Sequence, residues 1–414
     1  MTSTAIFYTI ITILCVFFII ERIISYLNLS YSSHPLPNEI SDLYDSEKRK
    51  KQLAYQHANT YLSTLDSCTS LIFVLLVICL GGFGWLDNIV KGWFEFPVWQ
   101  ALAFFGIFFV AQHIIHLPFN IYDTFVIEER FGFNRTTAKT FVTDELKSLG
   151  LNILINGLIF GLITYIYTIV PDWFWLIAWS VVMAFSIFMS LFYSNLIVPL
   201  FNKQTPLPEG ELRTAIEQFA AKVGFKIDNI YVMDSSKRSS HANAYFTGFG
   251  RRKRIVLYDT LIDSMTTDEI VAVLAHEIGH NQHHDTIKNI VSAAIHNLIV
   301  FGLLGLTLKL DVVAQAVGAE EASFHVNMIV FSLLFSPISE LIDIFENILS
   351  RHNEYEADRF ATENGMGEHL IAGLKKLTTD SLGNPMPHPL AVFLTYSHPT
   401  LYQRIVAIRN NEEH

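Results

Sequence analysis

The chain has 414 residues, of which 51% are hydrophobic and only 16% are charged, whereas about a quarter of the residues of a soluble domain are charged. This balance favours a protein that lies in lipid. The net charge of −11 excludes nucleic acid as a partner, because a phosphate backbone requires a basic surface. The cysteines, Cys15, Cys68 and Cys79, lie inside apolar runs without CxxC spacing, so neither a disulfide framework nor a thiolate metal site is expected.

Seven apolar segments come close to the 20 or so residues that a helix needs to cross about 30 Å of hydrocarbon. The first segment lacks the basic start and the small-residue cleavage site of a signal peptide, so we expect it to be a retained span. The predicted fold is therefore a mostly α membrane protein with seven transmembrane helices. The segments run approximately from Ile6 to Ile24, Cys68 to Leu86, Val98 to Leu117, Leu151 to Val170, Trp173 to Ile197, Ile290 to Leu308 and Val326 to Leu349.

The basic residues of the connecting segments indicate the orientation of these spans. The segments after the first, third, fifth and seventh spans contain 4, 4, 11 and 6 Lys and Arg, and with Arg22 they hold 26 of the 28 basic residues. Cytoplasmic loops are enriched in Lys and Arg. We therefore expect the C-terminus and the long loop after the fifth span in the cytoplasm, and the N-terminus on the other side.

Several spans contain polar side chains that lipid would penalise. Such residues usually face a bundle interior or a wet cavity, and their other common role is hydrogen bonding between helices. As a set they predict a hydrated interior. They are His113 and His116 in the third span, Asn152 and Asn156 in the fourth, His296 in the sixth, and Glu340, Asp343 and Glu346 in the seventh.

The long loop contains an HExxH motif, HEIGH at residues 276–280. Thr266 and Glu269 have the spacing of a capping box, which predicts the start of a helix. On that helix His276 and His280 share one face and can reach one zinc ion, with Glu277 beside the open position as general base for a water molecule. The motif alone also fits a surface helix with structural histidines, so a further ligand is needed.

A polar helical stretch directly after the seventh span offers this ligand. Glu354 and Asp358 are four residues apart and face the same side. Glu354 can supply a carboxylate to the metal, and Asp358 can hold a ligand histidine in the required tautomer. Glu356 and His352 are alternative ligands, but both point away from the face of Glu354.

Two short runs before the HExxH helix are rich in β-branched and aromatic residues, which predicts a β-hairpin. They extend from Tyr245 to Phe249 and from Ile255 to Tyr258, around a turn at Gly250 and Arg251. The hairpin either braces the zinc helix or exposes an edge to which an extended peptide can add.

Together these motifs resemble the type I CAAX prenyl endopeptidases, which are integral-membrane zinc proteases of the gluzincin type. The resemblance extends over nearly the whole chain, and its elements occur in the same order. The segments that carry it are residues 128–135, 243–249, 254–261, 276–280, 354–358 and 397–404, together with the seven spans.

The resemblance implies that seven tilted helices enclose a water-filled chamber with the active site at its cytoplasmic end. It implies one Zn²⁺ per chain bound by His276, His280 and Glu354, with Glu277 as the base. His398 and Arg404 would assist near the metal, where a cationic donor stabilises a developing oxyanion.

The hairpin strand that contains Asn243, Ala244 and Tyr245 would bind the substrate in this family. The expected partners are therefore peptides or proteins, either prenylated or membrane-associated, and the lipid bilayer. Four segments are predicted: 1–201 with spans one to five, 202–287 with the edge strand and the HExxH helix, 288–349 with spans six and seven, and 350–414, which completes the zinc site.

Two features bear on location and on other functions. The loop between the last two spans is short and the C-terminus carries no recognisable retention signal, which favours a bacterial plasma membrane. Two alternatives stay open. A quality-control protease of the heat-shock membrane type would have about four spans, and a transporter with structural zinc would have four protein ligands and no metal-bound water.

Overall fold

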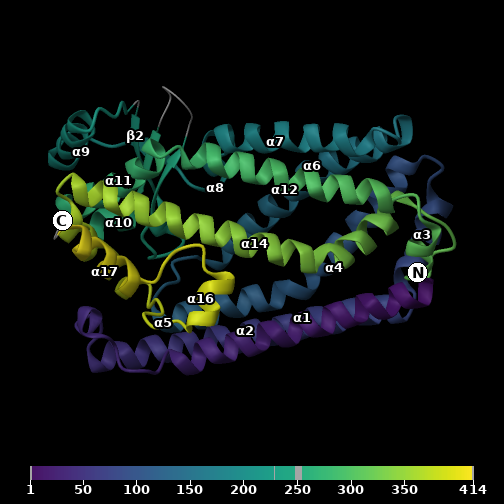
Figure 1. Ribbon diagram of the computed structural model, residues 1–414, viewed down its shortest axis with the longest axis horizontal. Helices are drawn as coiled ribbons and strands as arrows, with labels where there is room; N and C mark the ends of the chain where they lie inside the picture. Colours follow the sequence, from purple (N-terminus) through teal and green to yellow (C-terminus); the bar gives the residue numbers. More distant parts are fainter. Residues whose placement is uncertain (1, 228, 248–253, 413–414) are drawn as a thin grey trace.

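The computed structural model describes residues 2–227, 229–247 and 254–412. Long helices run along the longest axis of the molecule, and shorter elements gather at its two ends (Figure 1). The N-terminus and α3 (Gly82–Trp93) lie at one end, while the C-terminus and the helix with the HExxH motif lie at the other (Figure 1).

In the described part of the chain, seven helices have the length and the apolar composition needed to cross a membrane. This confirms the predicted number of spans. The helices are α1 (Ser3–Tyr31), α2 (Ser46–Cys79), α4 (Pro97–Tyr122) with its continuation through η2 (Asp123–Glu128) and α5 (Glu129–Phe131), α6 (Ala138–Ile169), α7 (Phe174–Leu196), which leads into α8 (Val198–Phe201), α12 (Asp285–Thr307) and α14 (Phe324–Glu363).

The remaining helices are short. Their bounds are η1 (Asn38–Ile40), α9 (Glu211–Lys222), η3 (Ser235–Lys237), α10 (Asp259–Ser264), α11 (Thr267–Gln282), α13 (Asp311–Gln315), α15 (Gly367–Asp380), α16 (Pro389–Thr395) and α17 (Leu401–Glu412). The predicted segment boundary between residues 349 and 350 falls inside α14, so one uninterrupted helix joins the last span to the predicted zinc ligand.

The predicted second span, Cys68 to Leu86, was wrong at its C-terminal end. Helix α2 stops at Cys79, and Gly81 follows with a φ of +67°, a conformation that costs glycine little. Helix α3 then packs against the loop after α13, where a Cβ at Gly84 would lie 1.9 Å from the carbonyl oxygen of Gly318. Phe83 and Leu86 near the end of this run are therefore buried in protein, whereas Trp85 is exposed.

A small sheet lies beside the HExxH helix. It consists of β1 (Gln204–Pro206), β2 (Asn229–Met233), β3 (Ala244–Thr247) and β4 (Arg254–Tyr258), in the order β1-β2-β4-β3. Strands β2 and β4 are parallel, and the other two pairs are antiparallel. The β3–β4 pair confirms the predicted hairpin, although Phe249, Gly250 and Arg251 lie outside the described residues. Among the described strands β3 pairs only with β4, so it is an edge strand.

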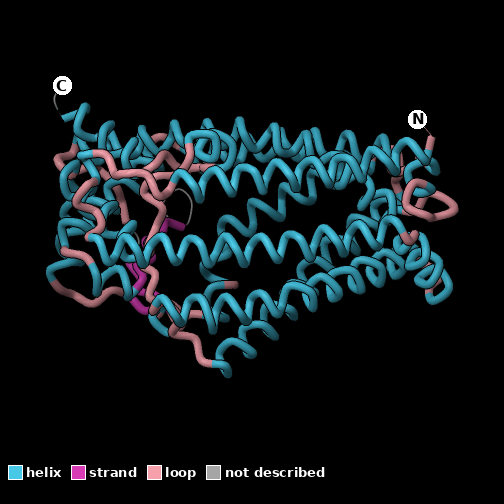
Figure 2. Tube along the Cα trace, turned by 90° about the horizontal axis from the view of Figure 1, so that it is seen from below, coloured by secondary structure: helices cyan, strands magenta, loops and turns pink. Residues whose placement is uncertain are grey.

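The largest hydrophobic core lies at this same end of the molecule, where Figure 2 shows the strands among loops and helix ends. Its residues come from the sheet, α9, α11, α15 and α17, and include Ile230, Leu257, Ile270, Leu370 and Ile405. By contrast, only 6% to 17% of the residues in the apolar window of each span are buried. The core therefore fixes α11, whereas most side chains in the apolar windows of the spans remain accessible.

Four of the eight polar side chains inside the spans, His113, His116, His296 and Glu346, lie against a side chain of a neighbouring helix. One of these contacts is short enough for a hydrogen bond between helices, and the other two are longer; the hydrated interior stays a prediction. The pairs are His113 Nε2 with Glu145 at 3.6 Å (α4 and α6), His116 Nδ1 with Asp66 at 2.7 Å (α4 and α2), and His296 Nδ1 with Glu346 at 3.6 Å (α12 and α14).

Candidate metal centre and active site

Helix α11 begins where the capping box predicts. The backbone N–H of Glu269 donates to Thr266 Oγ1 at 3.3 Å, and the backbone N–H of Thr266 donates to Glu269 Oε2 at 2.8 Å. Two orphan donors of the first turn are thus satisfied. Ten residues into the helix, His276 and His280 lie on one face with their Nε2 atoms 3.2 Å apart.

Helix α14 crosses α11 at a point where Gly279 faces the small residue Ala357. A Cβ added to Gly279 would lie 2.8 Å from Cα of Ala357, and Ala357 is fully buried. Such close contact between backbones is possible only with very small residues. It brings the side chains of α14 within reach of both histidines.

Glu354 is the carboxylate that α14 contributes. Its Oε1 lies 3.2 Å from His280 Nε2, and its Oε2 lies 3.5 Å from His276 Nε2. Donor atoms of the three side chains all lie within 4.8 Å of one another. Glu354 is 4% exposed, and its Oε2 accepts no hydrogen bond from any described residue. Two imidazole nitrogens and one carboxylate with a free lone pair fit a catalytic zinc site.

The two alternative ligands do not join this group among the described residues. Glu356 pairs with Arg359 at 2.5 Å and lies 3.8 Å from His283. His352 is absent from the converging donor atoms of the described part of the chain. A structural zinc site with four protein ligands is therefore not supported there.

Each histidine is held by a carboxylate on its other ring nitrogen. Asp358 Oδ1 lies 2.8 Å from His276 Nδ1, which is the position that its predicted role requires. Arg404 binds the same carboxylate in a bidentate manner, with Nε 2.8 Å from Oδ2 and Nη2 2.6 Å from Oδ1. A carboxylate on Nδ1 keeps the proton there and turns Nε2, with its lone pair, toward the metal.

Asp285 does the same for His280, and the sequence analysis missed it. Its Oδ2 lies 2.9 Å from His280 Nδ1, its side chain is almost fully buried, and Lys288 Nζ donates to its Oδ1 at 2.7 Å. Asp285 is the first residue of α12, where an acidic residue is common because it favours the helix dipole. Its position five residues after His280 was the available signal.

These contacts shift the protonation of His280. Burial opposes its charged form, but hydrogen bonds to Glu354 and Asp285 outweigh that effect and raise the pKa of His280 to about 9. Without a metal ion the ring therefore carries a proton at neutral pH. A bound metal must displace this proton, since only neutral imidazole is a ligand.

The remaining predicted residues lie against the same carboxylates. Arg404 is 8% exposed, and its Nη1 lies 3.3 Å from Glu354 Oε2. His398 Nε2 lies 3.3 Å from Glu354 Oε1, and its side chain is 63% exposed. Ser397 Oγ is hydrogen-bonded to His398 Nδ1 at 2.8 Å. The contacts of Arg404 support the ligands, whereas His398 is open to a substrate. An oxyanion role for either residue stays a prediction.

A cavity of about 350 Å³ connects the site to the edge strand. Asn243, Ala244 and Glu277 line it together with a row of leucines from α15. Tyr245, which was also predicted to bind substrate, does not line this cavity. Its hydroxyl lies 3.3 Å from Ser194 Oγ and 3.4 Å from Gln204 Nε2, so its side chain points to the other face of the sheet. The Tyr245 side chain therefore lies away from the cavity that Glu277 lines.

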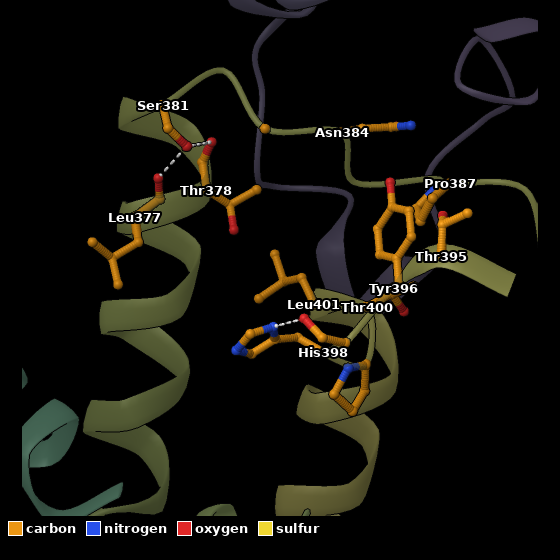
Figure 3. A pocket seen from close by; sticks show the side chains of 13 residues that line it. Leu377, Thr378, Ser381, Asn384, Pro387, Thr395, Tyr396, His398, Thr400 and Leu401 are labelled. Atoms are coloured by element: carbon orange, nitrogen blue, oxygen red, sulfur yellow. Dashed lines mark hydrogen bonds between the residues drawn. The ribbon is translucent and has the colours of Figure 1, made fainter. Parts of the chain in front are cut away.

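A second cavity of about 530 Å³ adjoins the first. His398 and Leu377 line both cavities. Figure 3 shows His398 between the helix of Leu377 and the segment of Leu401. The candidate site is therefore the inner end of a longer depression in the surface.

A seven-span helical protein whose HExxH helix meets a glutamate from a second helix is an integral-membrane metalloendopeptidase of the gluzincin type. Comparison with known proteins agrees. Residues 25–203 match the family described as "CAAX prenyl protease N-terminal, five membrane helices", and residues 206–412 match peptidase family M48. The chain belongs to the CAAX prenyl protease group of family M48.

Individual relatives cover nearly the whole chain. CAAX prenyl protease 1 homolog of Homo sapiens is 31% identical over 92% of this chain and 90% of its own length. Probable CAAX prenyl protease 1 of Schizosaccharomyces pombe is 34% identical over 90% of this chain and 81% of its own. The crystal structure of S. mikatae Ste24p superposes with a TM-score of 0.92 at 32% identity, covering 97% of this chain and 99% of that one. Seven spans and these relatives separate the chain from the heat-shock type, for which about four spans are expected.

The carboxylate of Asp285 gives a first test of the metal centre. We expect Asp285→Asn to weaken zinc binding by about 10- to 100-fold, the usual cost of losing such a partner, because the amide no longer fixes the tautomer of His280. Asp263→Asn on the exposed side of α10 is the matched control. Zinc affinity is measured by competition with a fluorescent chelator, and equal affinities of both variants would contradict the assignment.

Gly279 gives a second test. Gly279→Ala would force α11 and α14 apart, which separates His280 from Glu354, so we expect zinc to be lost from a protein that is still helical. Gly373→Ala on α15 is the control, because its Cβ would approach α11 only at an ordinary 3.5 Å from Val273. Zinc content and circular dichroism are measured together. Full zinc occupancy in Gly279→Ala would show that the close contact is not required.

Proposed function

We propose that the chain hydrolyses peptide bonds with one zinc ion held by His276, His280 and Glu354. The observation that carries this proposal is the convergence of the three donor groups in a cavity that Glu277 also lines. Zinc, when bound, supplies a Lewis acid that polarises the scissile carbonyl and makes water acidic at neutral pH.

The protein's own residues then perform the proton transfers. Glu277 follows His276 directly on α11 and accepts a proton from the attacking water, and afterwards it returns a proton to the leaving amine. His398, with its exposed ring near Glu354, donates to the oxyanion that develops on the carbonyl. Arg404 holds Asp358, and through it His276, in the orientation that the metal requires.

The substrate peptide adds to the open edge of β3. The backbone N–H of Tyr258 donates to the carbonyl of Asn243 at 3.0 Å, so the alternation of an antiparallel pair turns the backbone groups of Ala244 and Phe246 outward. Asn243 Oδ1 now accepts from the N–H of Ala244 at 2.8 Å. A substrate carbonyl would replace this local bond, and a peptide would lie extended toward Glu277.

The substrate that fits best is the C-terminal segment of a prenylated CAAX protein, in which two aliphatic residues follow the modified cysteine. The names of the relatives support this choice. So does the apolar wall of the cavity, which Leu370, Leu374 and Leu377 form on α15 and which suits aliphatic side chains. General cleavage of membrane-associated peptides needs the same edge strand, but it needs neither the prenyl group nor this wall.

Glu277→Gln tests the mechanism. We expect peptide cleavage to fall by about 100-fold or more, since the general base is lost, while zinc stays bound because the three ligands are intact. Glu356→Gln, a carboxylate that lies outside the site, is the matched control and should cleave normally. Full activity of purified Glu277→Gln would overturn the proposed mechanism, and loss of zinc from it would show a ligand role instead.

A pair of peptides tests the substrate. One ends in a farnesylated CAAX sequence, and the other is identical but unmodified. We expect the farnesylated peptide to have a kcat/KM at least about tenfold higher, because binding energy from the lipid chain is added to that of the backbone. Equal cleavage of both peptides would favour general membrane proteolysis over CAAX processing.

We also propose that the active site faces the cytoplasm, as the distribution of Lys and Arg predicts. The test uses a chain in which Cys15, Cys68 and Cys79 are replaced by alanine and single cysteines stand at Lys203 or Lys309. In sealed vesicles with the cytoplasmic side outward, an impermeant maleimide should label Lys203→Cys directly and Lys309→Cys only after detergent. The reverse labelling would invert the topology.

The membrane in which the protein lies is a separate question. The bacterial plasma membrane, expected from the short last loop and the missing retention signal, stays a prediction. The relatives named above are eukaryotic, so they lend it no support.

A further inference from the structure

A second group of metal-binding side chains lies outside the active site. His296 of α12 converges with Asp343 and Glu346 of α14, and one donor atom from each lies within 4.8 Å of the others. In the part of the chain that the structure describes, only this group and the catalytic one meet that condition. The second group joins two of the seven spans.

The second group faces the same side of α14 as the catalytic ligand. Asp343 precedes Glu354 by 11 residues, which is three helical turns and about 16 Å along the axis. Eleven residues also bring a side chain back to within about 20° of the same direction. The apolar residues Leu341 and Phe345 of this stretch lie on the other side of α14 and are 59% and 72% exposed. Asp343 itself is exposed and His296 and Glu346 are partly buried, so we infer that the group opens toward the interior that the spans surround.

The two carboxylates of this group lack a cation. Ser292 Oγ donates to Glu346 Oε1 at 3.0 Å, and His296 Nδ1 lies 3.6 Å from the same oxygen, which is too far for a good hydrogen bond. Asp343 makes no hydrogen bond or ion pair with any described residue, and within the described ranges neither carboxylate pairs with Lys or Arg. Two such charges within a membrane span are costly without a counterion.

We propose that His296, Asp343 and Glu346 form a second binding site for a divalent transition-metal ion of the Zn²⁺ class. One imidazole and two carboxylates suit zinc, manganese or iron, and because the group is open to the interior, water would complete the coordination. A bound ion neutralises both carboxylates and ties α12 to α14. These two helices also contain Asp285 and Glu354. The second ion would therefore stabilise the relative position of the two helices that contribute these residues to the catalytic site.

The test counts zinc ions per chain. Purified full-length protein is stripped of metal, equilibrated with a series of buffered free Zn²⁺ concentrations, and analysed by mass spectrometry of the metal. We expect two ions per chain at saturation, one in His280→Ala, one in His296→Ala, and none in His280→Ala/His296→Ala. Asp343→Asn, which keeps the side-chain shape, should raise the Kd of the second ion by more than about tenfold.

Two controls separate binding from misfolding. His113→Ala removes a histidine that also faces a glutamate at 3.6 Å but has no third donor, and it should keep two ions. With Co²⁺ in place of zinc, the visible absorption of the second equivalent should disappear in Asp343→Asn while that of the first remains. The proposal is overturned if the wild-type protein saturates at one ion, or if His296→Ala and Asp343→Asn still bind two.

Discussion

The close contact between α11 and α14 at Gly279 is the constraint on which the metal centre depends. Packed helices normally lie 8–10 Å apart because side chains separate them. Here an added Cβ would lie 2.8 Å from Ala357 Cα, so no larger residue fits. Each helix carries half of the chemistry: α11 supplies His276 and His280, and α14 supplies Glu354. Glycine inside a helix costs about 1 kcal/mol relative to alanine. In return, the two helices lie close enough for the side chains of His276, His280 and Glu354 to reach one another.

Burial of charge explains why the site is built in layers. Each ligand histidine meets a carboxylate, and each carboxylate meets a cation: Arg404 backs Asp358, and Lys288 backs Asp285. A buried carboxylate without a partner would be destabilising by several kcal/mol. The two layers come from different parts of the chain, since Arg404 lies on α17 and Lys288 on α12. Docking of the C-terminal helix and orientation of His276 are therefore one event, and stability of the core at this end is a condition for metal binding.

Features of the structure that depend on residues close together in the sequence were predicted correctly. Features that depend on contacts between distant segments were not. The capping box, the spacing of His276 and His280, and that of Glu354 and Asp358 follow from helical periodicity, and the structure agrees with each. The prediction of where the second span ends was wrong because hydropathy does not distinguish a residue in lipid from one that is buried in protein. Leu86 is buried in protein. Asp285 was missed because its contact with His280 depends on the conformation of the turn between α11 and α12. The direction of Tyr245 depends on strand register, which a short hairpin sequence does not specify.

The length of α14 relates the membrane to the active site. Its 40 residues span about 60 Å, roughly twice the thickness of the hydrocarbon, so one end must extend beyond the bilayer. Glu354 lies in that end, whereas Asp343 and Glu346 lie nearer the middle of the helix. A peptide on β3 would thus meet the metal at the level where the helix leaves the lipid. A segment attached to the membrane arrives there without crossing water, and part of the entropy cost of binding is removed before it contacts the edge strand. Under the proposed function, this arrangement would favour membrane-attached substrates over soluble ones even when both present the same peptide backbone.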